Sequence, residues 1–429
     1  MKYLILHLFL WLSFLPLWAQ DVPAPGPTQS ETIILRNGTI HVGNGEIKTG
    51  FLVMEQGKIT VVGKLEQTYK TAREIDLEGK HVYPGLILID NNMGLIEIGQ
   101  VRATRDQREI GQVNSNARAL IAYNTDSKIA PTVRSNGVLM AQIAPSGGIF
   151  SGQSSVVQLD AWNFEDAAVR ADDAVYLNWP NLRYRESRFA LPIPVQQKRA
   201  QEQTDRIREV MQKAKAYMLE QASNRPMEHN QQLEALVPIL KKEKKLFIRA
   251  SSEKQIIEAI AFAREWDIEI VIVGGRDAYR QVDLLKRFDV PVVLTGTHIL
   301  PSRPDEGVYS MYEQPQKLHA AGITFAITIT SNWQGRNLPF QAGSAVAFGL
   351  EPEAAIQAIT SHPAKILGID DEYGTLAVGK SATLVVSEGD IMDMRNSQII
   401  HAFIDGREVN LNNKQKDLYQ KFLKKYQGK

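Results

Sequence analysis

The chain has 429 residues, of which 44% are hydrophobic and 23% are charged. This composition is typical of globular proteins and excludes collagen-like, coiled-coil and disordered chains. With 49 Lys and Arg against 48 Asp and Glu, the net charge of +1 gives no global basic field for nucleic acid. The sequence contains 0 Cys, which excludes disulfides, thiolate metal sites, iron–sulfur clusters and a cysteine nucleophile.

The first 19 residues have the pattern of a secretory signal peptide. Lys2 precedes an almost wholly apolar run over residues 3–18, which is short for a membrane anchor. We expect cleavage after Ala19 and a proline-containing linker over residues 20–30. The mature protein is then expected to be secreted or periplasmic, with no membrane contact.

Both ends of the mature chain carry short alternating apolar runs separated by glycine turns, a pattern that indicates antiparallel β structure. These runs lie within residues 31–81 and again within residues 366–412. Because a few short strands alone bury little apolar surface, we expect the two ends to combine in one composite β-sandwich domain.

Residues 82–365, between these ends, show apolar strands that alternate with helical segments. Four consecutive units span residues 246–359, including a helical pattern over residues 253–266. This alternation predicts an α/β fold, and its repetition favours a (β/α)8 barrel of TIM type. Residues 162–195 are rich in Trp, Arg and Pro and fit no such unit. We expect them to form an insertion at the barrel mouth or an oligomer contact.

Several glycine- and proline-containing motifs occur in a fixed order along the chain. It reads LEGKHVYPGLI over residues 77–87, PAKILG over residues 363–368 and GTLAVGKSATL over residues 374–384. In this order they resemble the metal-dependent amidohydrolase superfamily, nearest its imidazolonepropionase-like group. The resemblance covers nearly the whole mature chain. It implies a (β/α)8 barrel with a composite β-sandwich, and hydrolysis of C–N bonds in amides, lactams or small peptides by metal-bound hydroxide.

The resemblance also implies where the metal ligands would lie, and other residue types occupy those positions. Aligned by the Pro-Gly dipeptide, the first-strand His-x-His pair becomes Asp90 and Asn92, and the fifth-strand histidine becomes Arg249. The last strand ends near Asn332 without the family's carboxylate. Zinc requires converging imidazoles and carboxylates, and a guanidinium cannot ligate a cation. We therefore expect no cofactor, although the family would use Zn²⁺ or another divalent metal.

The candidate site residues at the barrel mouth are Asp90, Asn92, Arg249, His298 and Asn332. Asp90 and Asn92 either bind Mg²⁺ or Ca²⁺ or cap a strand end. Arg249 either pairs with Asp90 in the vacated metal position or binds an anion. His298, the one histidine expected at the mouth, is either a general base or a structural histidine.

Two further segments carry recognisable patterns. The glycine-rich stretch over residues 146–154 resembles a phosphate-binding loop but has Gln153 where that loop needs lysine, so we expect it to shape a loop over the barrel mouth. The lysine-rich tail over residues 413–429 is expected to be a basic helix that packs Leu418, Phe422 and Leu423 on the body and leaves a solvated basic face.

Two functions of different classes follow. The first is an amidohydrolase-type hydrolase that acts on C–N bonds of a small amide or peptide. The second is a catalytically inactive subunit of the same fold that binds a small-molecule or small-peptide ligand, or pairs with an active paralogue. Partners would then be a ligand of this kind and a homo-oligomer or a hetero-oligomer with an intact amidohydrolase, but no nucleic acid. Metal content distinguishes the two hypotheses, because only the first requires a bound divalent ion.

Overall fold

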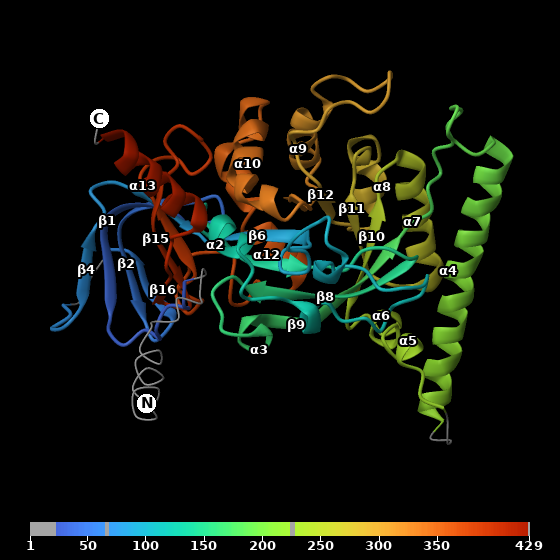
Figure 1. The fold of residues 1–429 in the computed structure, drawn as a ribbon, viewed down its shortest axis with the longest axis horizontal. Helices are drawn as coiled ribbons and strands as arrows, with labels where there is room; N and C mark the ends of the chain where they lie inside the picture. The colour runs from blue at the N-terminus through green and yellow to red at the C-terminus, as the bar shows by residue number, and fades with distance from the viewer. Residues whose placement is uncertain (1–22, 65–67, 224–227, 428–429) are drawn as a thin grey trace, which may run out of the picture.

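A computed structural model describes residues 23–64, 68–223 and 228–427 of the chain. A sheet domain lies at one end, a barrel lies in the middle, and the long helix α4 (Ile193–Ala222) stands at the far edge (Figure 1). The expected signal peptide and the first three linker residues, within 1–22, lie outside the described residues, as do 428 and 429 of the tail.

Both ends of the chain contribute strands to the sheet at the left of Figure 1, which confirms the composite domain. The strands run in the order β16-β15-β14-β5-β1-β2-β3, and β4 pairs with β1. The C-terminal strands join the N-terminal ones where β14 pairs with β5 in antiparallel fashion. Their bounds are β1 Ile33–His41, β2 Ile47–Glu55, β3 Lys58–Gly63, β4 Arg73–Asp76, β5 His81–Pro84, β14 Leu384–Ser387, β15 Ile399–Ile404 and β16 Arg407–Glu408.

Eight strands in sequence order form the second sheet, which confirms the barrel. Its strands are β6 Leu86–Asn91, β7 Val138–Ile143, β8 Phe150–Gln158, β9 Ala168–Asn178, β10 Lys245–Ala250, β11 Ile270–Gly274, β12 Val292–Leu294 and β13 Phe325–Ile327. Between the first and last strands, the Thr328 hydroxyl donates to the Ile89 carbonyl at 2.5 Å and accepts from the Ile89 amide at 3.0 Å. A side chain therefore bridges the two edges of the sheet.

The direction of β8 departs from the parallel arrangement expected from sequence. It pairs in antiparallel fashion with both β7 and β9, whereas the other neighbouring pairs in this sheet are parallel. Only residues 144–149 separate β7 from β8, and residues 159–167 separate β8 from β9. These connections are too short for the crossover that parallel strands need, so the chain must reverse direction.

The expectation that residues 162–195 form an insertion is wrong for residues 168–178. Residues 168–178 form β9, a strand of the barrel between β8 and β10. The first half of β9 is polar and partly exposed, while the stretch from Ala174 to Leu177 is fully buried. The first half of β9 forms a hairpin with β8, and only its second half lies in the barrel. The strand therefore lacks the unbroken apolar run of a buried parallel strand, and the sequence pattern does not predict it.

Helices cover the barrel and the connections between its strands. α7 spans Glu253–Trp266 as expected, because Ser252 and Gln255 form a reciprocal capping box at its start and Asp267 adopts a left-handed conformation at its end. The others are α2 Ile129–Arg134, α3 Phe164–Ala167, α5 Gln231–Glu234, α6 Val237–Leu240, α8 Val282–Arg287, α9 Ser310–Ala320, α10 Leu338–Ala347, α11 Pro352–Gln357, α12 Ser361–Leu367 and α13 Lys414–Gln427, with short 3-10 turns η1 Arg102–Thr104, η2 Ala119–Ala122, η3 Ala278–Arg280 and η4 Trp333–Asn337.

A buried ion cluster joins the barrel to the sheet domain and the linker. Asp160 is fully buried and contacts Arg134 of α2 at 2.5 Å and Arg407 of β16 at 3.2 Å. The same carboxylate accepts the backbone amide of Gly26 at 2.8 Å, so part of the expected linker is fixed against the body. One buried charge thus links three segments that are far apart in the sequence.

The C-terminal helix α13 forms where the sequence predicts it, but Leu418 and Phe422 do not pack on the body, while Leu423 is half-buried. None of its residues is buried, and Leu418 and Phe422 are 43% and 49% exposed. Polar groups make the contact instead: Asn413 donates to the Ser135 hydroxyl, and Gln415 accepts from Thr132. Within the described ranges, no helix is long and apolar enough to cross a membrane.

Candidate functional site

A cavity of about 330 Å³ opens at the carboxyl ends of the barrel strands. This end of such barrels is where catalytic and binding residues gather. Its lining comes from the ends of seven strands or the residues just after them, namely Asp90, Asn91, Asn92, Ala144, Ser146, Asn178, Arg249, Ser251, Val273, Gly274, Thr295 and Thr330.

Asp90 and Arg249 form an ion pair at the base of this cavity, as the sequence predicted. The Arg249 Nη2 lies 2.5 Å from Asp90 Oδ1, and its Nε lies 3.3 Å from Oδ2, which makes the contact two-pronged. The guanidinium also lies over the Tyr176 ring, 4.3 Å from its centroid. Burial alone would lower the pKa of Arg249, but the Asp90 carboxylate outweighs it and raises that pKa above its ordinary value.

All five N–H groups of Arg249 are used within the protein. Besides the two that reach Asp90, Nη1 donates to Ser151 Oγ and to Asn178 Oδ1 at 3.3 Å each, and Nη2 donates to the Pro145 carbonyl at 2.8 Å. A guanidinium has five donors, so none remains for a bound anion. The geometry therefore favours the structural role of Arg249 over the anion-binding alternative.

Residues 146–149 of the glycine-rich stretch form a loop at the barrel mouth, as the sequence predicts, whereas residues 150–154 belong to β8. Gly147 and Gly148 adopt positive φ angles of 83° and 65°, and Asn178 donates to both of their carbonyls. This contact fixes Asn178 for its bond to Arg249. The sequence does not predict that Asn178, Ser151 and Tyr176 belong to the site. If residues 168–178 are interpreted as a strand, Asn178 falls at the carboxyl end of that strand and therefore at the barrel mouth.

A polar network lies deeper in the barrel, beneath the ion pair. Asp173 is buried and accepts hydrogen bonds from Ser154 Oγ at 2.8 Å and from Gln142 Nε2 at 2.6 Å. Gln142 in turn accepts from the Tyr176 hydroxyl at 2.7 Å. Burial raises the pKa of Asp173 to about 6 despite these hydrogen bonds. Sequence patterns do not point to this carboxyl, because they do not predict the strand β9.

Asn92 faces the same cavity but has an unsatisfied acceptor. Its Oδ1 is buried and has no hydrogen-bond partner within the described chain. By contrast, neighbouring Asn91 is fully engaged, since its amide donates to the Ile329 carbonyl and its Oδ1 accepts from the Met93 amide. A buried acceptor without a partner costs free energy, so this oxygen is a destabilising feature of the site.

The side chains of this cavity do not fit a catalytic metal ion. Among its described lining residues there is no histidine, and the one carboxylate, Asp90, is neutralised by Arg249. A cation there would face the guanidinium at ion-pair distance. Elsewhere in the described ranges, no group of three or more His, Cys, Asp or Glu could hold a metal ion.

The other two sequence candidates lie outside the cavity lining. His298 is exposed, and its Nε2 contacts the Ser344 hydroxyl at 2.5 Å. Burial of its ring lowers the pKa of His298 below its ordinary value. Asn332 begins η4, where its Oδ1 accepts from the Trp333 amide, and its Nδ2 donates to the Ile96 carbonyl. The structure therefore brings together Asp90, Asn92 and Arg249, while the side-chain contacts of His298 and Asn332 are with other groups.

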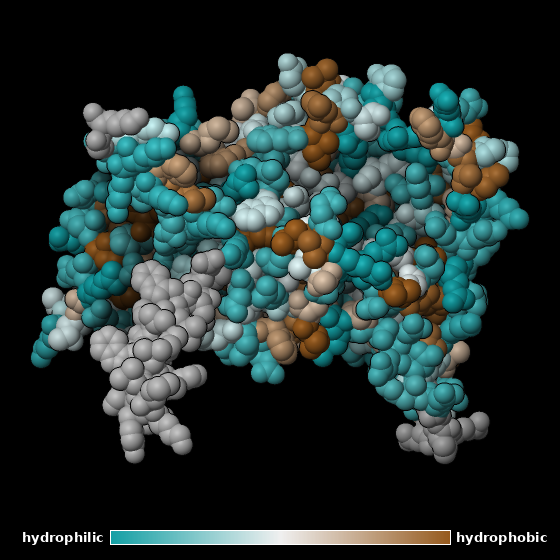
Figure 2. All heavy atoms as spheres, in the orientation of Figure 1, coloured by the Kyte–Doolittle hydropathy of each residue, from teal (hydrophilic) through white to brown (hydrophobic). Residues whose placement is uncertain are grey.

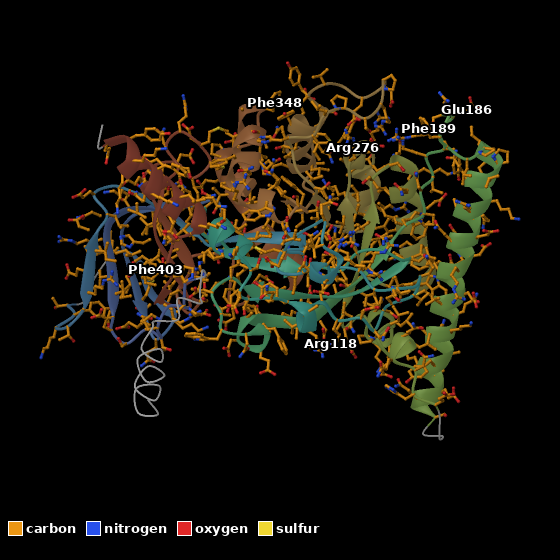
Figure 3. The ribbon with its side chains drawn as sticks, viewed as in Figure 1. Arg118, Glu186, Phe189, Arg276, Phe348 and Phe403 are labelled. Atoms are coloured by element: carbon orange, nitrogen blue, oxygen red, sulfur yellow. The ribbon has the colours of Figure 1, made fainter. Side chains whose placement is uncertain are left out.

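Ion pairs fix the loops around the mouth. Arg276, after β11, lies 2.6 Å from the buried Glu306, and Arg303 binds Asp277 through two nitrogens at 2.5 and 2.6 Å. Figure 3 shows Arg276 near the same upper edge as Phe189, which belongs to the loop after β9. The mouth is therefore framed by loops held in place by charge pairs.

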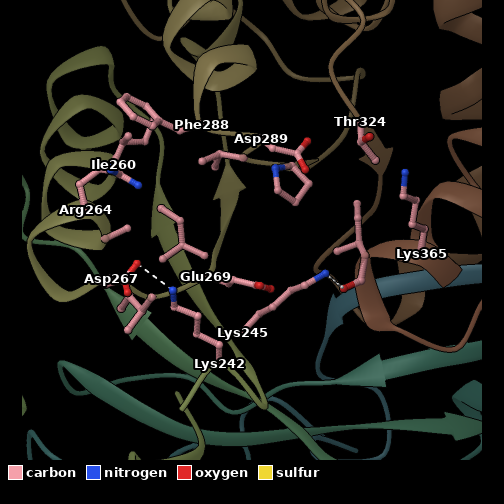
Figure 4. Close-up of a pocket in the computed structure, with 16 residues that line it drawn as sticks. Lys242, Lys245, Ile260, Arg264, Asp267, Glu269, Phe288, Asp289, Thr324 and Lys365 are labelled. Atoms are coloured by element: carbon pink, nitrogen blue, oxygen red, sulfur yellow. Dashed lines mark hydrogen bonds and ion pairs between the residues drawn. The ribbon is translucent and has the colours of Figure 1, made fainter. Parts of the chain in front are cut away.

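A second cavity, of about 340 Å³, opens near the amino ends of β10, β11 and β12 (Figure 4). Lys242 pairs with Asp267 there at 2.7 Å, and Lys245 donates to the Ile366 carbonyl at 3.4 Å. Residues at this end of such a barrel usually stabilise the fold and do not take part in catalysis. The mouth cavity is therefore the better candidate for function.

Comparison with known proteins agrees with this architecture. Residues 296–409 match the amidohydrolase family, and no curated protein sequence matches the chain. An amidohydrolase structure from Thermotoga maritima MSB8 is 24% identical, with 88% of this chain and 99% of that chain covered and a TM-score of 0.78. A prolidase structure complexed with N-methylphosphonate-L-proline is 16% identical, with 88% of this chain and 99% of that chain covered and a TM-score of 0.54. Molinate hydrolase is 17% identical, with coverage of 90% and 95% and a TM-score of 0.53. The chain has the fold of these hydrolases, and its residues 296–409 match the amidohydrolase family.

Proposed function

We propose that this protein is a member of the amidohydrolase family that binds a small ligand at its barrel mouth and does not carry out metal-dependent hydrolysis. The observation that carries the proposal is the Asp90–Arg249 pair, which fills the position where the resemblance would put metal ligands. Fold alone does not decide function, and the residues of the site do.

The chemistry of the lining favours an uncharged ligand that donates hydrogen bonds. Asp90 and Arg249 satisfy each other, so the cavity presents no free charge. Asn92 Oδ1 offers a buried acceptor, and Ser251, Thr295 and Thr330 add hydroxyl groups to the lining. A charged ligand would lose its hydration without gaining a counter-ion. A small neutral amide meets these requirements.

Binding of matched neutral and charged probes tests this proposal. We expect N-acetylglycinamide to give a saturation-transfer NMR signal with the mature protein, and its anionic counterpart N-acetylglycine to give none. Asn92→Leu should abolish the signal because it removes the acceptor in the cavity. His298→Gln serves as the control, since that exposed side chain is not part of the lining and its loss should leave binding unchanged. Preferential binding of N-acetylglycine would contradict the proposal.

Hydrolysis of C–N bonds is the second candidate, favoured by the family match and by the fold shared with prolidase and molinate hydrolase structures. An assay of an Xaa-Pro dipeptide and of molinate, with and without added Zn²⁺, separates the two candidates. We expect no turnover above that of buffer in either condition. Turnover that a chelator abolishes and Zn²⁺ restores would show that the hydrolase function is retained.

A further inference from the structure

The C-terminal helix α13 presents an apolar stripe to the outside of the molecule. Leu418, Phe422 and Tyr426 follow one another at four-residue spacing and are 43%, 49% and 63% exposed. Residues with this spacing lie above one another on one side of a helix. Hydrophilic and apolar side chains adjoin on this part of the surface in Figure 2, over the place of α13 in Figure 1.

The flank of the helix that faces the body adjoins this stripe. Gln415, Lys416 and Tyr419 line a groove of about 680 Å³ together with Trp333 of η4. At about 100° per residue, Tyr419 and Lys416 lie about 100° and about 160° around the helix from Leu418, whereas Gln415 falls between Phe422 and Tyr426. The exposed fractions of Leu418, Phe422 and Tyr426 show that the stripe is not covered even though the helix is attached to the barrel.

Lysines adjoin the stripe along its outer side. Lys414, Lys421 and Lys425 fall within a narrow arc next to Leu418 on the helix circumference. Over its described length α13 carries five lysines and one acid, Asp417, which gives a charge of +4. Among the ion pairs of the described residues, none involves these five lysines, which are Lys414, Lys416, Lys421, Lys424 and Lys425. The helix thus combines exposed apolar surface with unneutralised positive charge.

We propose that α13 docks this protein on an anionic lipid surface, with the apolar stripe in the interface and the lysines at the headgroups. The sequence alone favoured a solvated basic face, but that interpretation assumed that the apolar side was packed on the body. Helices that lie in a membrane interface typically carry apolar and aromatic residues such as Leu, Phe and Tyr on one face and lysines on the adjoining face. The charge of α13 complements anionic headgroups, and a straight stripe needs no shaped pocket. The helix lies on the bilayer rather than crossing it, in agreement with the absence of a spanning helix from the described ranges.

Vesicle flotation of the full mature protein tests this proposal. We expect binding to vesicles that contain phosphatidylglycerol, and binding at least ~10-fold weaker to phosphatidylcholine alone or at high salt. The double variant Leu418→Ser, Phe422→Ser should no longer insert its apolar stripe into the membrane interface. The double variant Lys421→Gln, Lys425→Gln should lose the electrostatic attraction to the anionic headgroups. The side chains are exposed, so each variant should keep the melting temperature of the parent.

Matched controls keep the outcome unambiguous. Lys213→Gln with Lys215→Gln makes the same change of charge on exposed positions of α4 and should leave vesicle binding unchanged. If this control loses as much vesicle binding as the α13 variants, the net charge of the protein alone determines binding, and the docking role of α13 is overturned. Absence of vesicle binding also overturns it. A dimer in light scattering that the Leu418 and Phe422 changes dissociate would instead identify the stripe as a protein interface.

Discussion

Substituting Asp173 by asparagine should change how the stability of this protein depends on pH. Asp173 is buried inside the barrel, and burial raises its pKa from 3.8 to about 6. The folded state therefore holds a proton on this carboxyl between about pH 4 and pH 6, where the unfolded chain has released it. Stability from this group is fully present below about pH 4 and is lost as the pH rises through about 6.

The size of the effect follows from the shift. A difference of about 2 pKa units corresponds to about 3 kcal/mol at about 1.36 kcal/mol per unit, and the side chain is fully enclosed, so no discount for solvent screening applies. Asparagine has the same shape. Its oxygen can accept from Gln142 Nε2, and its amide can donate to Ser154, whose hydroxyl lies 3.4 Å from the Ala174 carbonyl and can turn toward it.

Urea unfolding of the parent and of Asp173→Asn, followed by circular dichroism between pH 4 and pH 7.5, measures this difference. We expect the free energy of unfolding of the variant, relative to the parent, to rise by about 3 kcal/mol across this interval. Subtracting the free energy of unfolding of the parent removes the contributions of the other carboxyls, which both proteins share. A difference that stays constant with pH would show that Asp173 titrates near its ordinary pKa, and the reasoning from its burial would be refuted.

Two further substitutions test the charge pairs by urea unfolding at pH 7. Asp160→Ala should cost about 3 to 5 kcal/mol, because it leaves Arg134 buried without its partner and frees Arg407; a loss under 1 kcal/mol would contradict this. Arg249→Ala should cost about 2 to 3 kcal/mol, at the lower end of such values because 23% of the arginine side chain is exposed, and Asp90→Ala in the same chain should recover part of the loss. A double variant as unstable as the sum of the two single variants would mean that the pair has no coupling energy.

The sequence predicted those features that depend on short, regular patterns. The helix over residues 253–266 has its cap and its apolar spacing within one segment, and α7 forms there. The Asp90–Arg249 pair was predicted because both residues occupy positions that would share one metal centre, and their charges are opposite. Local patterns and one well-placed motif were enough for both.

Features that depend on the rest of the chain could not be predicted in the same way. The polar half of β9 conceals a strand that the barrel buries only from Ala174 onward. The position of α13 is set by polar contacts of Asn413 and Gln415 with distant residues, so its amphipathic pattern indicated the wrong buried face. The partners of Arg249 on β8 and β9, Ser151 and Asn178, likewise appear only when the strand order is known.

A calorimetric titration with Zn²⁺ tests most directly whether the Asp90–Arg249 pair occupies the position where the resemblance would place the metal. The protein should show no tight zinc site, because its cavity offers one neutralised carboxylate and no imidazole. A variant with Asp90→His, Asn92→His and Arg249→His should bind Zn²⁺ more tightly than the parent, since it supplies three imidazoles around the same cavity. Tight, stoichiometric zinc binding by the parent, or equally weak binding by both proteins, would contradict the claim.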